Sequence, residues 1–124
     1  MNGLKFTIEV KSDLLAIKTN NIAIEYRNSK SNTESGITAT LADIWVHLIS
    51  VPDGGIQAYA ITVEKLRHYT ETVLPYKHFI AAGDANSCLW IYKMTDILPE
   101  FQRFDHIKKD SQLKALFSEL LIEK

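Results

Sequence analysis

Two early segments of the chain, residues 6–11 and 21–27, alternate apolar and polar side chains, and this period of two constrains both to be strands. The apolar positions are, in order, Phe6, Ile8, Val10, Ile22, Ile24 and Tyr26. Successive side chains of a strand point to opposite faces of its sheet. We therefore expect each segment to pack its apolar face inward and to present its polar residues together on the other face.

The polar face of the first segment places a carboxylate beside an ammonium group. Glu9 and Lys11 are separated by one residue, so they project from the same face of the strand. The carboxylate of such a pair can bind a divalent metal ion, because hard cations prefer oxygen ligands. The ammonium group can bind a scissile phosphate, because it favours nearby negative charge. The alternative is a solvated strand face on which the two side chains form a modest ion pair.

Glu25 offers a second carboxylate, on the polar face of the segment 21–27. Two adjacent strands would then each present a carboxylate. Metal binding is one interpretation of Glu25, and a surface ion pair with Arg27, on the same face, is the other. Residues 1–31 carry five Lys or Arg against three Asp or Glu, which is a mild positive excess around the candidate site.

The rest of the chain mixes strand-type and helix-type segments without internal repeats. A segment rich in Ser, Asn and Lys predicts an exposed loop over residues 28–36. Apolar runs predict further strands over 44–50, 56–63, 78–82 and 88–94, with turns over 52–55 and 83–86. Helices are predicted over 41–43, 64–73 and from 111 onward, capped by Thr38 or Thr40, by Thr62 and by Ser111. This order of elements indicates a single α/β domain over residues 1–124 with a mixed sheet.

The last predicted helix carries one apolar stripe, and the strand over 44–50 carries a Trp and a His. The stripe consists of Leu113, Leu116, Phe117, Leu120 and Leu121. Such a stripe must cover the sheet or a partner chain. Trp45 and His47 are interpreted as core and edge residues of their strand, and His47 is not assigned as a general base.

Composition and charge narrow the classes of protein to which the chain can belong. The formal net charge of −1 gives no global sign of nucleic-acid binding, so any basic surface must be local. Cys88 is the single cysteine, which excludes an intrachain disulfide and a cysteine-based zinc cluster. The four histidines lack the close ligand spacings of zinc sites. With no long apolar run and no hydrophobic leader, we expect an intracellular, cytoplasmic protein without a membrane partner.

Four runs of the sequence follow one another in the order found in a known family. They are IEVKSD at 8–13, TNNIAIEY at 19–26, SGIT at 35–38 and ADIWV at 42–46. In this succession the chain resembles small phage-type nucleases of the PD-(D/E)XK superfamily, closely over residues 6–50 and more loosely over 82–84 and 89–98. The resemblance implies a restriction-endonuclease-like fold, in which helices flank a mixed central β-sheet, and a phage or prophage origin.

The resemblance also implies an activity and the residues that carry it. The expected activity is a DNA endonuclease that uses Mg²⁺, or Mn²⁺ in its place, to hydrolyse phosphodiester bonds in branched or duplex DNA. Glu9 would bind the metal ion together with the backbone carbonyl of Val10 and with Glu25, while Lys11 would position and activate the attacking water. Contacts to DNA would come from Lys18, Asn21, Arg27, Lys30 and Ser35.

The chain departs from the family pattern before Glu9. The family's metal-binding Asp lies on a strand upstream of Glu-x-Lys, yet none of the eight residues before Glu9 is acidic. Four explanations are open: an N-terminally shortened chain, substitution by Glu25, a ligand from another subunit, or a domain that no longer cuts. The alternative functions are therefore a non-catalytic nucleic-acid-binding protein and a homodimeric assembly protein on the same fold.

Overall fold

The strands of the protein form two four-stranded sheets in the computed structural model, which describes residues 5–14, 16–80, 86–106 and 109–122. Sheet A has the order β1-β4-β5-β8, with β1 (Ile8–Asp13), β4 (Ile44–Ser50), β5 (Ile56–Thr62) and β8 (Gln102–Arg103). Sheet B has the order β3-β2-β7-β6, with β2 (Asn21–Asn28), β3 (Thr33–Glu34), β6 (Lys77–Ile80) and β7 (Ser87–Lys93). Helices and short helical turns connect them: α1 (Ala16–Thr19), η1 (Gly36–Thr38), α2 (Val63–Thr72), α3 (Met94–Ile97), η2 (Leu98–Glu100) and α4 (Asp110–Ile122).

The predicted α/β class is confirmed, and the predicted mixed sheet is sheet A. In sheet A, β1 pairs with β4 in parallel, whereas β4 with β5 and β5 with β8 are antiparallel. In sheet B, all pairings between the described strands are antiparallel. The strands thus divide between two sheets instead of joining one central sheet.

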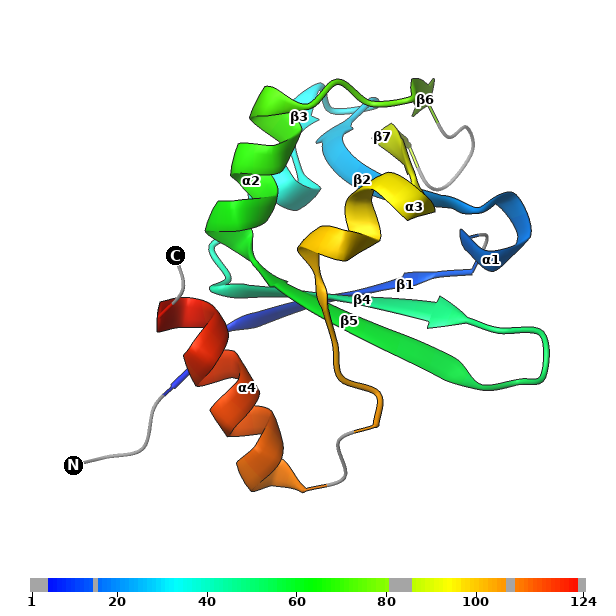
Figure 1. Ribbon diagram of the computed structural model, residues 1–124. Helices are drawn as coiled ribbons and strands as arrows, with labels where there is room; N and C mark the ends of the chain where they lie inside the picture. Colours follow the sequence, from blue (N-terminus) through cyan, green and yellow to red (C-terminus); the bar gives the residue numbers. More distant parts are fainter. Residues whose placement is uncertain (1–4, 15, 81–85, 107–108, 123–124) are drawn as a thin grey trace.

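The two faces of sheet A are buried by different elements (Figure 1). One face packs against sheet B and α2, and it contributes Trp45, Ile49 and Ile61 to the main core. The other face is covered by α4, whose Phe117 lies between Phe6 and Phe104, with ring centroids 6.0 and 5.8 Å apart. The apolar stripe of the last helix therefore covers the sheet, as one of its two predicted roles requires. Among the described residues, no helix has the length and apolar character that a membrane span requires.

The predicted orientation of the first strand is wrong. Ile8 and Val10 are 42% and 54% exposed, whereas the side chains of Glu9 and Lys11 are half-buried on the face toward sheet B. The reason is that β1 is an edge strand in register with β4, so Glu9 lies beside buried Trp45. The apolar face of β1 lies on the α4 side of sheet A, where α4 packs on β4 and β5 and leaves Ile8 and Val10 largely uncovered.

The remaining local predictions have mixed outcomes. Thr62 caps α2 as predicted, since its hydroxyl accepts a hydrogen bond from the backbone N–H of Lys65 at 3.1 Å. The predicted helix over 41–43 is wrong, because the short helical turn is η1 and the Thr40 hydroxyl accepts from the Ala42 N–H instead of capping a helix. Ser111 is also not the cap of α4, which already begins at Asp110. Of the predicted turn over 83–86, residues 83–85 lie outside the described part of the chain.

The phenol of Tyr92 is buried where β7 meets α2, which predicts a titration at high pH. Tyr92 is 2% exposed, and its hydroxyl donates a hydrogen bond to the Val73 carbonyl at 2.9 Å. Burial, assisted by the nearby Tyr69, raises the pKa of Tyr92 to about 12. Because the unfolded value is about 10, stability is retained below that pH and is lost as the pH rises from about 10 toward 12. In a titration followed by phenolate absorbance, we expect the transition at the highest pH to belong to Tyr92 and to be absent from Tyr92→Phe. If Tyr92→Phe instead lost absorbance from the transition at the ordinary tyrosine pKa, the prediction would be contradicted.

Candidate functional site

Glu9 and Lys11 lie side by side on β1, as their spacing predicts. The Lys11 Nζ is 3.5 Å from Glu9 Oε2, and the two side chains are 35% and 34% exposed. The Lys11 ammonium also lies over the Trp45 ring, 5.8 Å from its centroid, in a cation–π contact. The pair is therefore held in place by sheet A and yet remains accessible to a ligand.

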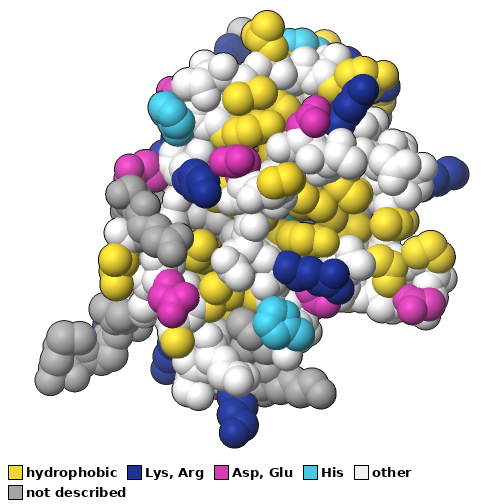
Figure 2. Space-filling model, viewed as in Figure 1, with side chains coloured by type: hydrophobic (Ala, Val, Ile, Leu, Met, Phe, Trp, Pro, Cys, Tyr) yellow, Lys and Arg dark blue, Asp and Glu magenta, His cyan; other side chains and the backbone are white. Residues whose placement is uncertain are grey.

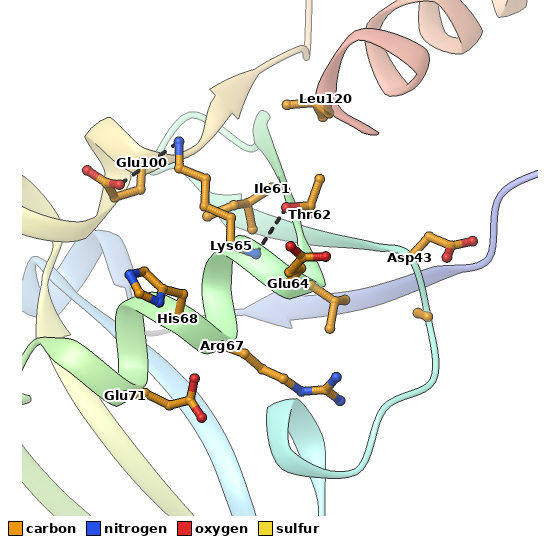
Figure 3. A pocket seen from close by; sticks show the side chains of 12 residues that line it. Asp43, Ile61, Thr62, Glu64, Lys65, Arg67, His68, Glu71, Glu100 and Leu120 are labelled. Atoms are coloured by element: carbon orange, nitrogen blue, oxygen red, sulfur yellow. Dashed lines mark hydrogen bonds and ion pairs between the residues drawn. The ribbon is translucent and has the colours of Figure 1, made fainter. Parts of the chain in front are cut away.

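The Glu9 carboxylate is oriented by a second donor, which α2 holds in position. The Thr40 hydroxyl donates to Glu9 Oε1 at 3.1 Å, while Glu9 Oε2 faces Lys11. Arg67 extends from α2 toward the η1 segment (Figure 3), where its Nε donates to the Ile37 carbonyl at 2.9 Å and its Nη2 donates to the Thr40 carbonyl. Arg67 thus fixes the loop that carries Thr40, and each Glu9 oxygen has a partner.

A hollow of about 390 Å³ opens beside Lys11, between the two sheets. Its walls include Lys11 and Asp13 from β1, His47 from β4, and Glu25 from β2. The Glu25 Oε1 accepts a hydrogen bond from the Ser87 hydroxyl at 3.0 Å, which holds this carboxylate on sheet B. The structure therefore brings Glu25 and Lys11, which are predicted site residues from different strands, to the walls of one hollow.

Asp13 joins the two sheets at the base of this hollow, a role that the sequence did not predict. Its Oδ2 accepts the Ala23 N–H at 3.2 Å and lies 3.0 Å from His47 Nε2. Trp45 Nε1 donates to His47 Nδ1 at 3.3 Å. Because an indole N–H is a donor only, His47 Nδ1 must accept, and the ring proton of this neutral imidazole is on Nε2 and is donated to Asp13. His47 is 1% exposed, so it is buried like Trp45 and is not the edge residue that the sequence led us to expect.

This link fixes the distance between the walls of the hollow. Asp13 follows Lys11 on the same face of β1, and Ala23 precedes Glu25 on the same face of β2, each at a spacing of two residues. Asp13 shares this spacing with Glu9 and Lys11, which was the signal in the sequence. Its partner His47 could not be found that way, because it is 34 residues away along the chain.

Removing the Asp13 carboxylate should therefore destabilise the fold. In Asp13→Ala, the Ala23 N–H and His47 Nε2 lose their common acceptor in a largely buried place, so we expect the free energy of unfolding to fall by about 2–3 kcal/mol. The matched control is Ser12→Ala, an exposed position on the same strand, for which we expect a change within about 0.5 kcal/mol. Urea unfolding of both variants checks this, and equal stabilities would show that the link contributes little.

The predicted DNA-contacting residues are not gathered in one place. Arg27, Lys30 and Ser35 lie at the hairpin formed by β2 and β3, whereas Lys18 lies in α1 and Asn21 lies at the opposite end of β2. Arg27 donates to the side-chain and backbone oxygens of Asn32 at 2.8 and 2.9 Å, and a register shift in β2 separates it from Glu25. Instead of the surface ion pair considered between Glu25 and Arg27, Arg27 bonds to Asn32 and Glu25 bonds to Ser87.

The described residues contain no group of three or more His, Cys, Asp or Glu side chains that is placed to hold a metal ion. Within the described ranges, Glu9 is thus not joined by two further side chains of these types in an assembled metal centre. Mg²⁺, however, is often bound through one or two carboxylates, while water and substrate phosphates complete its shell. The accessible Glu9 side chain fits a site at which the protein supplies a carboxylate and DNA supplies phosphate oxygens.

A second and larger hollow, of about 730 Å³, lies at the start of α2 (Figure 3). Its walls include Asp43, Glu64 and Glu71 together with Lys65, whose Nζ is 4.0 Å from Glu100 Oε1. Its walls carry Asp43, Glu64, Glu71 and Glu100 against Lys65 and Arg67, and neither Glu9 nor Lys11 contributes to it. The hollow beside Lys11 is therefore the candidate site.

No family model, curated protein or solved structure matches the chain. What the chain does must therefore be inferred from its own residues and contacts.

Proposed function

We propose that the protein is a PD-(D/E)XK-type nuclease that hydrolyses phosphodiester bonds in DNA, with Glu9 and Lys11 as its catalytic residues. The observation that carries this proposal is the side-by-side placement of an accessible carboxylate and ammonium group, 3.5 Å apart, with Lys11 on the wall of a hollow. The parallel pairing of β1 with β4 in a mixed sheet is compatible with a restriction-endonuclease-like fold. We place this activity in the cytoplasm, where it would meet branched or duplex DNA.

Lys11 would position the attacking water and stabilise the phosphate. Its ammonium group can donate hydrogen bonds to the attacking water and offset negative charge on a phosphate that approaches the exposed side of β1. Trp45 and Glu9 hold it there, so little reorganisation is needed when DNA binds. Glu25, on the opposite wall, excludes the phosphate from the back of the hollow and keeps it at the rim.

Glu9 would be the protein's ligand for a divalent cation. Its carboxylate is oriented by Thr40, and the Val10 carbonyl is directed to the open edge of the same strand. When bound there, Mg²⁺ or Mn²⁺ would supply positive charge that stabilises the phosphate oxygens as the bond breaks. Because no group of three candidate ligand side chains is assembled among the described residues, we expect the free protein to bind Mg²⁺ weakly and the DNA complex to bind it more tightly.

A non-catalytic DNA-binding protein is the second candidate function, and the same lack of an assembled metal centre favours it. Both functions are tested by incubating the protein with branched, single-stranded and duplex DNA in Mg²⁺, Mn²⁺ or chelator. Cleavage that needs the metal ion supports the nuclease. Binding that weakens with salt, without cleavage, supports the second function instead. If neither cleavage nor binding is detected at low salt, both proposals are rejected.

A further inference from the structure

The outer edge of β1 is unpaired in the part of the chain that the structure describes. β1 is the terminal strand of sheet A, and its other edge pairs with β4. The Thr7 carbonyl accepts hydrogen bonds from the N–H groups of Asp43 and Ile44 at 2.8 and 3.1 Å, so it points toward β4. Since these groups alternate along a strand, the N–H and C=O groups of Ile8, Val10 and Ser12 point outward. Such an edge is a template for another strand.

We infer that this edge pairs with β1 of a second copy of the chain, in an antiparallel arrangement with Val10 opposite Val10 of the partner subunit. This register places Glu9 opposite the partner's Lys11 and, by the twofold symmetry, Lys11 opposite the partner's Glu9. Opposite charges that face each other across two strands stabilise the pairing. The sequence of β1 is therefore complementary to itself.

Neighbouring registers lack this complementarity. A shift by one pair in one direction places Glu9 opposite Glu9 of the partner subunit, and the reverse shift places Lys11 opposite Lys11 of the partner subunit. Like charges directly opposite each other destabilise a strand pair. The charges of β1 thus select one register among those that keep the same side chains on the same face.

The direction of the backbone groups strengthens this pairing. Because Val10 points its N–H and C=O outward, the two Val10 residues would exchange hydrogen bonds, so in the dimer the Val10 carbonyl is not offered to a cation and Glu9 alone would hold it. Glu9 and the partner's Lys11 then form a pair without such bonds, in which opposing side chains approach most closely. On the other face, the pairing would cover Ile8 and Val10, which are 42% and 54% exposed. Dimerisation therefore accounts for the apolar face that α4 leaves uncovered.

The consequence for the candidate site is that two copies of the Glu9–Lys11 pair would lie together on one face of a continuous sheet. Each pair would then be flanked by the partner's pair. This arrangement does not depend on cleavage, because it follows from the edge of β1 and its charges alone. It can therefore be correct even if the protein is not a nuclease.

Charge exchange tests the inference, with molar mass measured by light scattering over a range of protein concentrations and without DNA or metal. The wild type is expected to dimerise. Glu9→Lys and Lys11→Glu each create two like-charge pairs and should weaken dimerisation about ten- to a hundredfold. The double variant Glu9→Lys/Lys11→Glu restores opposite charges at both places and should dimerise within about threefold of the wild type.

A second variant tests the backbone pairing independently of charge. Val10→Pro removes an N–H that points outward and leaves the hydrogen bonds to β4 in place, so it should give a folded monomer, with folding checked by circular dichroism. A wild type that stays monomeric at all concentrations would overturn the inference. It would also be overturned if the single charge variants dimerised as tightly as the wild type. An interface elsewhere, such as one formed by the exposed Phe79 and Ile80 of β6, would leave the charge variants as tightly dimeric as the wild type. Hydrophobic side chains are exposed at the end of the molecule where Figure 1 places β6 (Figure 2).

Discussion

Gly36→Ala is expected to destabilise the protein more than Asp13→Ala does. Gly36 has a φ of +56°, and a Cβ added to it would lie 2.1 Å from the Glu25 carbonyl oxygen and 2.7 Å from the Glu25 carbonyl carbon. Backbone atoms at these distances cannot move aside without displacing β2. Adding this clash to the cost of a left-handed conformation, we expect a loss of about 3–5 kcal/mol in the free energy of unfolding.

Gly54 supplies the matched control for this prediction. Its φ of +89° is also unfavourable for alanine, but a Cβ there would meet no atom within 4 Å. Gly54→Ala should therefore cost only about 1–2 kcal/mol, which is the conformational part of the effect. Urea unfolding separates the two contributions. Equal losses in the two variants would show that the contact between η1 and β2 can relax.

Lys11→Met is expected to lower the rate of DNA cleavage by about 10²–10⁴-fold. Methionine keeps an apolar stem against Trp45 but removes the ammonium group that would position the attacking water. DNA binding should change much less than the rate, because a single cation contributes one phosphate contact at most. Single-turnover cleavage and equilibrium binding, measured on the same DNA, separate these two effects.

Lys65→Met is the control for Lys11→Met. Lys65 lies on α2, its side chain is 56% exposed, and it contacts Glu100 instead of the candidate site. Its replacement should leave the cleavage rate unchanged. If both lysine variants cleaved DNA as fast as the wild type, Lys11 would have no catalytic role.

The elements predicted best were those specified by local signals. β4 and β5 follow apolar runs on either side of the turn at 52–55, and α2 begins after a threonine whose hydroxyl caps it. The common direction of Glu9 and Lys11 was likewise predictable, because it depends only on the period of a strand. Local chemistry alone determines these features.

The features that could not be predicted depend on contacts between distant segments. Alternation along β1 shows that it has two different faces, but not which layer covers each face. That outcome depends on the register with β4 and on the reach of α4. The pairing of β2 with β7 instead of with a strand of sheet A, and the hydrogen bond between Asp13 and His47, are similarly non-local. Thr38 or Thr40 was expected to cap a helix, whereas the Thr40 hydroxyl contacts Glu9 in the folded chain.

The most direct test of the central claim is the rate at which Glu9→Gln cleaves DNA in Mg²⁺, compared with Glu34→Gln. Both substitutions remove one negative charge and keep the size of the side chain, but Glu34 is exposed on β3, away from Lys11. We predict that Glu34→Gln cleaves like the wild type and that Glu9→Gln is slower by at least about 10²-fold. Wild-type cleavage by Glu9→Gln would contradict the assignment of β1 as the catalytic strand.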